Sequence, residues 1–354
     1  MATADTLKRP ISGSDIDLLT AGGAVRADAH PGGLPLMVYA RDPKLATDQE
    51  AFFQWFRGNK ELFDRLASIY GALFFRGFPL TTTADFQNAI AHYPTGGLTY
   101  AGGGAPRHQL AERVFEATYA PKEWYLIPHQ EMAYMANYPR MISFFCQTAP
   151  SAGGETLLLD FREMESLVPR RMWDRVKECG VQYVRNFRNP EIKVSPTREV
   201  VHKSWTTSFN TNDPDEAVKT AHSINLECKW EPTDGSLTTW YTTRGFTEHP
   251  MTGETVWFNH IGAQSLNRRI LGPERWHAIV EERAEGSFLP NNTRYGDGGE
   301  IDPDDLEEIY RIFEVLGQAI RWREGDFTLV DNIFTAHGRT PYDGVRGVQV
   351  ALLK

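Results

Sequence analysis

The stretch from Pro128 to Tyr134 constrains the chain more than any other, because it sets a histidine and a carboxylate two residues apart. If residues 126–132 are extended, His129 and Glu131 project from the same face, since strand side chains alternate with a period of two. They could then take two adjacent positions on a metal ion. A second histidine from elsewhere would complete a two-histidine, one-carboxylate face, which suits non-haem Fe(II). The alternative is an ordinary polar strand.

The distant counterpart of this pair is the segment Ala336–Arg339, which contains His337. A histidine and an acid at this spacing arise about once by chance in a chain of this composition. The other features of the sequence therefore decide between a metal site and a polar strand.

Composition limits the classes of protein to which the chain can belong. Its 354 residues are 41% hydrophobic, which is enough for a large core in one catalytic domain with helical additions or in two joined domains. The net charge of −9, without a Lys/Arg cluster, argues against nucleic acid or an anionic membrane as a partner. No signal peptide or membrane-spanning run is recognisable, and three scattered cysteines indicate reduced thiols, so we expect a cytoplasmic protein.

Short strands separated by helices dominate the periodicity of the chain. Residues 1–45 contain several turn formers and predict an irregular lead-in. Strands are predicted near 72–75, 126–132, 141–146, 156–159, 181–187, 224–230, 237–243, 254–259, 327–330 and 348–352, and helices near 62–70, 161–178 and 302–320. This pattern predicts an α+β, mainly β fold: a sandwich or jelly roll with surrounding helices and helical insertions.

The order of several motifs resembles the TauD/TfdA-like Fe(II)/2-oxoglutarate-dependent dioxygenases, in their SyrP-like and clavaminate synthase-like branch. The matching pieces are residues 71–78, 127–134, 153–156, 253–259 and 295–298, then Gly325–Asp326 with Asp331–Asn332, and His337–Arg339 with Arg346. They follow the order of the family from about residue 70 onward. The first 45 residues lie outside the match.

The resemblance implies a double-stranded β-helix, which is a jelly-roll barrel, with iron at one mouth. It implies a single domain over residues 46–354 with an insertion around 161–300. His129, Glu131 and His337 fall on the iron ligands of the family. Arg346 falls on the arginine that binds the far carboxylate of 2-oxoglutarate, and Thr156 falls on a position that contacts the same co-substrate.

The chemistry of the residue types agrees with these positions. Arginine offers two parallel donors to a carboxylate and stays charged, and the Thr156 hydroxyl can add a hydrogen bond. An alternative for Arg346 is a surface arginine at the start of the last strand. Arg107 and Arg339 are candidates to pair with a substrate carboxylate, or are structural, and His260 is a candidate pocket residue.

These observations predict an Fe(II)- and 2-oxoglutarate-dependent oxygenase that consumes O2 and hydroxylates an unactivated C–H of a small amino acid-like metabolite. The metabolite would be free or tethered to a carrier protein, and the oligomeric state is not readable. Alternatives with the same cofactor are desaturation, cyclisation or epoxidation. A hydrolytic zinc site and a non-catalytic jelly-roll binding protein are the alternatives from other classes. We expect substrate contacts from the glycine-rich loop of residues 93–107.

Overall fold

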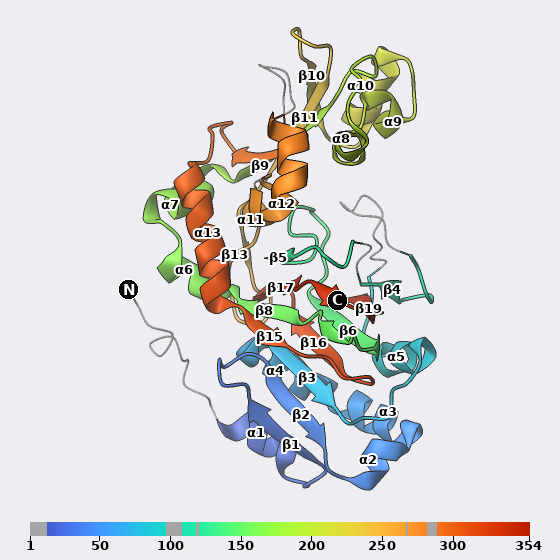
Figure 1. The fold of residues 1–354 in the computed structure, drawn as a ribbon. Helices are drawn as coiled ribbons and strands as arrows, with labels where there is room; N and C mark the ends of the chain where they lie inside the picture. The colour runs from blue at the N-terminus through green and yellow to red at the C-terminus, as the bar shows by residue number, and fades with distance from the viewer. Residues whose placement is uncertain (1–12, 97–107, 118–119, 267, 282–288) are drawn as a thin grey trace. The chain divides into compact units, whose positions relative to one another are not determined.

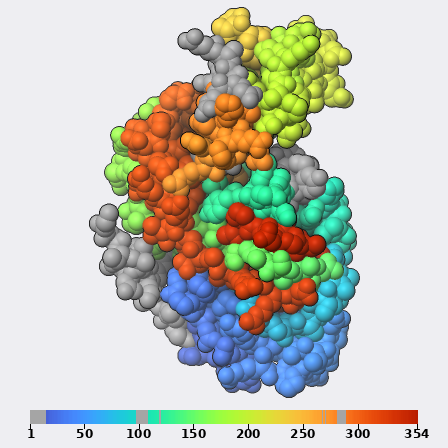
Figure 2. All heavy atoms as spheres, in the orientation of Figure 1, coloured from blue at the N-terminus to red at the C-terminus, as the bar shows by residue number. Residues whose placement is uncertain are grey.

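The largest sheet in the computed structural model has seven strands (Figure 1). The structure describes residues 13–96, 108–117, 120–266, 268–281 and 289–354. The strand order is β1 (Val25–Ala29), β2 (Leu36–Ala40), β3 (Ala72–Arg76), β16 (Phe327–Asp331), β6 (Met141–Thr148), β19 (Gly347–Leu353) and β4 (Phe115–Glu116). Strands β2 and β3 are parallel, and the other neighbours are antiparallel. Strands β19 and β6, distant in sequence, lie side by side (Figure 2).

The central strands of this sheet are buried on both faces, and their side chains alternate between two cores. In β6, Met141 and Phe145 belong to one hydrophobic cluster, whereas Ile142 and Phe144 belong to another. This is the period of two that the extended backbone imposes. It explains why these strands are almost continuously apolar in sequence.

Helices cover the face of the sheet that carries Met141 and Phe145. They are α3 (Gln49–Gly58), α4 (Lys60–Tyr70) and α5 (Thr83–Ile90). Their Phe52, Phe56 and Phe63 rings pack with Phe75 of β3 and Phe327 of β16, whose rings are stacked with centroids 4.5 Å apart. Two shorter helices, α1 (Gly13–Thr20) and α2 (Pro43–Thr47), belong to the same part of the chain.

A second sheet faces the other side. Its order is β15 (Gln318–Ile320), β8 (Thr156–Asp160), β17 (Thr335–Arg339) and β5 (Leu126–His129), all antiparallel. Leu158 of β8 and Ile320 of β15 share a hydrophobic cluster with Phe144 of β6 and Val330 of β16. The two sheets therefore pack face to face, in a mixed fold of helices and sheets.

Small elements complete this unit, which comprises residues 1–167, 247–258 and 311–354. They are β7 (Ala152–Gly153) paired with β18 (Tyr342–Asp343), β12 (Phe246–Glu248) paired with β13 (Thr255–Trp257), the 3-10 turn at Phe161–Glu163, and α6 (Met164–Leu167). Among the described residues, no helix combines the length and the apolar character needed to cross a membrane.

The second unit comprises residues 168–246 and 259–310. Its sheet has the order β10 (Glu227–Trp230), β11 (Leu237–Thr243), β9 (Val181–Phe187) and β14 (Asn291–Tyr295). Its helices are α7 (Arg170–Cys179), α8 (Pro196–Val201), α9 (Trp205–Phe209), α10 (Pro214–Ser223), α11 (Ile261–Gln264), α12 (Arg268–Trp276) and a π-helical turn at His277–Glu281. Helix α13 (Pro303–Leu316) contains residues of both units.

Two expectations from the sequence are wrong. Residues 13–45 are not irregular, because they form α1, β1, β2 and α2. Their turn formers connect these elements: Gly22–Gly23 lies between α1 and β1, and residues 30–35 connect β1 to β2. Helix α13 ends at Leu316, four residues before the expected end, because Gly317 follows and residues 318–320 form a strand. The expected single domain with an insertion around 161–300 stays a prediction.

Candidate metal centre

Two histidines that are distant in sequence become direct neighbours through the pairing of β5 with β17. His129 lies opposite His337 in the antiparallel register. Opposed residues of antiparallel strands project from the same face. Their ring centroids are accordingly 4.6 Å apart. The strand register therefore brings together two of the three candidate metal ligands.

Glu131 lies beside the two histidines, but it is not part of the extended segment that the sequence predicts. Strand β5 ends at His129, so the expectation of an extended segment through residue 132 is wrong for its last three residues. The chain turns at this point, and Met132 has a φ of 60°. Glu131 is buried in this turn, and its Oε2 atom lies 3.7 Å from Nε2 of His337.

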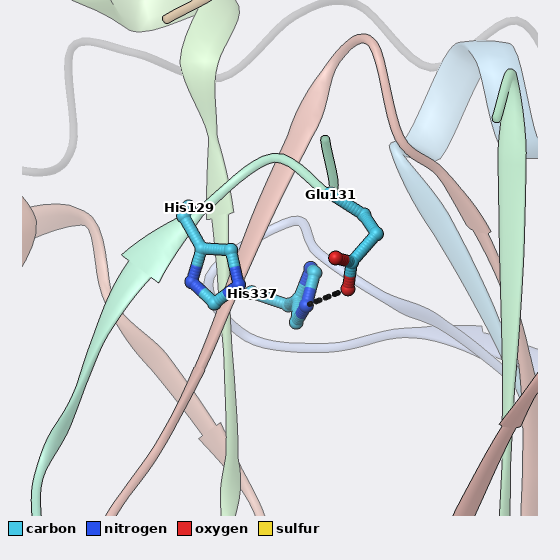
Figure 3. A group of neighbouring side chains, drawn as sticks. All are labelled: His129, Glu131 and His337. Atoms are coloured by element: carbon cyan, nitrogen blue, oxygen red, sulfur yellow. Dashed lines mark ion pairs between the residues drawn. The ribbon is translucent and has the colours of Figure 1, made fainter. Parts of the chain in front are cut away.

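The donor atoms of His129, Glu131 and His337 all lie within 4.8 Å of one another. Figure 3 shows the two rings and the carboxylate turned toward a common region. His129 Nδ1–H donates to the carbonyl of Ile127 at 2.8 Å, since a carbonyl can only accept. This fixes the tautomer in which Nε2 carries the lone pair, which is the form of histidine that binds a metal through Nε2.

The burial of His337 also fits a metal. Its side chain is 7% exposed, and Nδ1 has no hydrogen-bond partner among the described residues. The other ring nitrogen, Nε2, is the one that faces the Glu131 carboxylate, so Nε2 is the atom of His337 that can bind a metal. Two imidazoles and one carboxylate with open positions match the donor set of non-haem Fe(II), although Zn²⁺ accepts the same ligands.

Thr156 lies on the face of the sheet that carries the two histidines. In β8, Leu158 is opposite His337, and Thr156 is two residues away on the same side. The Thr156 hydroxyl accepts the indole N–H of Trp322 at 2.9 Å. An indole nitrogen can only donate, so the hydroxyl proton of Thr156 is left for another acceptor. This polarity suits a carboxylate ligand.

Arg346 directly precedes β19 and carries a buried positive charge. Its Nε–H donates to the carbonyl of Gly154 at 3.0 Å, and no carboxylate among the described residues forms an ion pair with it. Burial, together with the nearby charge of Arg339, lowers the pKa of Arg346 to about 10. The guanidinium is still charged at neutral pH, so it forms a site for an anion.

Arg339 makes a different set of contacts. Its guanidinium donates to the carbonyls of Pro121 and Trp124 at 2.7 and 2.9 Å, and to Ala120 at 3.4 Å. Burial lowers the pKa of Arg339. These hydrogen bonds connect residues 120–124, which precede β5, to β17. The expected substrate contact of Arg339 stays a prediction beside this structural role.

The structure does not assign the remaining candidates, Arg107 and His260, to the site. Arg107 and most of the loop 93–107 lie outside the described residues. His260 belongs to the second unit and precedes α11, where its backbone N–H donates to the Tyr183 hydroxyl at 2.8 Å. Sequence reasoning missed Trp322, because its bond to Thr156 spans 166 residues and leaves no local pattern.

The chain is similar to known proteins over most of its length. The family model of the taurine catabolism dioxygenase TauD, TfdA family matches residues 43–352. A clavaminate synthase-like protein of Arabidopsis thaliana is 28% identical over 310 residues, which cover 86% of this chain and 87% of that protein. The dapdiamide synthesis protein DdaC of Enterobacter agglomerans is 28% identical over 291 residues, or 82% and 84% of the two chains. Among solved structures, PvcB of Pseudomonas aeruginosa has a TM-score of 0.49 at 15% identity, covering 93% of this chain and 91% of PvcB.

Gly338 determines how closely β5 approaches β17. A Cβ atom at Gly338 would lie 2.6 Å from the carbonyl oxygen of Leu126, which is backbone and has little room to move. We therefore expect Gly338→Ala to separate the strands and weaken the binding of Mn(II), titrated into the metal-free protein, by about tenfold or more. Gly58→Ala is the matched control, since a Cβ there meets nothing within 4 Å. Equal affinities in the two variants would refute this explanation.

Proposed function

The chain belongs to the TauD, TfdA family of dioxygenases, and we propose that it binds its Fe(II) through His129, Glu131 and His337. The enzyme is an Fe(II)- and 2-oxoglutarate-dependent oxygenase. The observation that carries the residue assignment is the convergence of three donor atoms, from β5, the turn after it and β17, within 4.8 Å of one another. These three side chains would hold the ion and would leave coordination positions open for the co-substrate and O2.

Iron supplies the oxygen chemistry, and the chain supplies the geometry. With Fe(II) bound, one atom of O2 enters the succinate formed by decarboxylation of 2-oxoglutarate to succinate and CO2, and the other enters a C–H bond of the substrate. His129 is held in one tautomer by Ile127, so its Nε2 needs no rearrangement to bind the ion. Glu131 contributes the single negative charge of the ligand set.

We assign the binding of 2-oxoglutarate to Arg346, assisted by Thr156. The support is chemical: Arg346 is a buried cation that forms no ion pair with any carboxylate in the described part of the chain, and Trp322 leaves the Thr156 hydroxyl proton for another acceptor. A dicarboxylate that chelates the metal through its keto-acid end needs a cation for its other end. The Arg346 guanidinium is suited to that role.

We further propose that the two facing sheets form the double-stranded β-helix expected from the family resemblance. The support is that β16, β6 and β19 share a hydrophobic cluster with β8 and β15 of the second sheet. The Phe144 ring of β6 also lies 5.1 Å from the His337 ring of β17, measured between centroids. The metal ligands come from β5, the turn after it and β17, at the end of one of these sheets.

For the substrate, we propose a small amino acid-like metabolite, free or bound to a carrier protein, that is hydroxylated at an unactivated C–H. The resemblance to the clavaminate synthase-like branch supports this class. The match to a protein of dapdiamide synthesis supports a biosynthetic role. The chain is acidic, with a net charge of −9, which disfavours a polyanionic substrate.

The metal assignment predicts the behaviour of a histidine variant. His337→Ala removes one of three ligands, so we expect loss of stoichiometric Fe(II) binding, measured by anaerobic titration of the metal-free protein, and loss of succinate formation. The exposed His222 on α10 provides the control, and His222→Ala should bind one iron. Full iron occupancy in His337→Ala would end the assignment.

The co-substrate assignment predicts unequal effects of two substitutions. A hydrogen bond to a charged group contributes about 1.5–3 kcal/mol, so Arg346→Ala should weaken 2-oxoglutarate binding by about ten- to a hundredfold or more. Thr156→Ala should weaken it far less. Binding is measured by calorimetry with Mn(II) in place of iron. The exposed Arg323 is the control position, and an Arg346→Ala affinity equal to that of Arg323→Ala would contradict the assignment.

A substrate screen tests the reaction itself. We expect Fe(II), ascorbate and 2-oxoglutarate to support succinate release with an amino acid or its carrier-bound thioester, and the product to gain one oxygen atom. A product that loses two hydrogen atoms would favour desaturation or cyclisation instead. Oxidation of a carboxylate-free compound, with every amino acid inactive, would overturn the proposed substrate class. No succinate from any compound would favour a binding protein.

A further inference from the structure

The backbone that carries Glu131 requires an external support. It lies in the turn after β5, where Met132 adopts a φ of 60°. An L residue with a side chain rarely takes this conformation unless its surroundings impose it. The Glu131 side chain also has one more rotatable bond than an aspartate. A carboxylate in such a position is well placed only if its backbone is fixed.

The side chain of Asn332 provides this support. Its Oδ1 accepts the backbone N–H of Glu131 at 2.6 Å, and its Nδ2 donates to the carbonyl of Glu131 at 3.0 Å. The same Nδ2 donates to the carbonyl of Pro139 at 2.8 Å. Asn332 is completely buried. One planar amide therefore binds both polar groups of the Glu131 backbone. A carboxamide side chain can do this because its oxygen accepts a hydrogen bond and its nitrogen donates one.

Asn332 is itself fixed by the turn between β16 and β17. Its backbone N–H donates to the carbonyl of Arg140 at 2.9 Å. Asp331 Oδ1 accepts the backbone N–H groups of Ile333 and Phe334, both at 3.1 Å. Gln130 closes the connection from the other side, since its Nε2 donates to the carbonyl of Ile333 at 2.6 Å. The turn after β5 and the turn between β16 and β17 are thus interlocked, meaning that each donates hydrogen bonds to the other.

From these contacts we infer that Asn332 is a positioning residue for the metal site. It holds the backbone of Glu131 so that the carboxylate meets the two histidines. The turn that contains Asn332 leads directly into β17, which carries His337. One turn therefore sets the positions of two of the three ligands. This inference rests on the proposed role of Glu131 as an iron ligand.

A double-mutant cycle tests the inference through metal affinity rather than activity. Mn(II) is titrated into the metal-free forms of the unaltered protein, Asn332→Ala, Glu131→Ala and the double variant. We expect Asn332→Ala to weaken binding by about ten- to a hundredfold, as is typical for residues that orient a ligand. If Asn332 acts through Glu131, the same substitution should change the affinity less than about twofold in the Glu131→Ala background.

Asn186 on β9 is the matched control. It is also a buried asparagine with three side-chain hydrogen bonds, to Ser236, Thr238 and His202. Asn186→Ala should destabilise the protein to a similar degree, measured by thermal unfolding, and leave Mn(II) affinity unchanged. If Asn332→Ala does not fold, Asn332→Ser replaces it in the cycle, since a hydroxyl cannot span both Glu131 groups.

The outcomes separate the two proposals. Normal affinity in Asn332→Ala with weakened affinity in Glu131→Ala would overturn the role of Asn332 alone. A loss that persists in the Glu131→Ala background would assign Asn332 to the fold in general and overturn its positioning role. If neither Asn332→Ala nor Asn332→Ser folds, Asn332 is likewise assigned to the fold in general and its positioning role is overturned. Normal affinity in Glu131→Ala would overturn the proposed iron ligand, and the inference with it.

Discussion

The antiparallel pairing of β5 with β17 is the interaction on which the candidate site depends. It places His129 opposite His337, and it works only because Gly338 lets the two backbones approach. The pairing of β17 with β8 extends the same face to Thr156. A shift of this register by one residue would turn one histidine to the other side of the sheet. The register of β5 with β17 therefore decides whether the two histidines share a face.

Much of this arrangement can be predicted from the sequence, because its signals are local. The strands at 141–146 and 327–330 are apolar runs, and their all-buried patterns agree with that prediction. The spacing of His129 and Glu131 predicts that they are metal ligands. The order of the motifs identifies His337 and Arg346 as further candidates. The family assignment follows from the same local segments and agrees with the match over residues 43–352.

The parts that the sequence does not reveal depend on long-range contacts. Glu131 leaves the strand because Gln130 and Asn332 bond to backbone groups about 200 residues away. Strand β2 joins β3 in parallel across three helices, so the segment before residue 45 belongs to the sheet although its glycines suggest an irregular lead-in. The polarity of the Thr156 hydroxyl is set by Trp322, which no spacing rule connects to it.

The interlocked turns also have a consequence for the order of folding. The contacts between Asn332 and Glu131 join residues 201 positions apart, so the loop they close is long and its closure is entropically costly. Contacts of this kind form slowly and late. We therefore expect iron to bind after these turns have assembled rather than to nucleate the fold. Once bound, the ion stabilises the final pairing of strands by mass action, so metal occupancy reports whether folding has gone to completion.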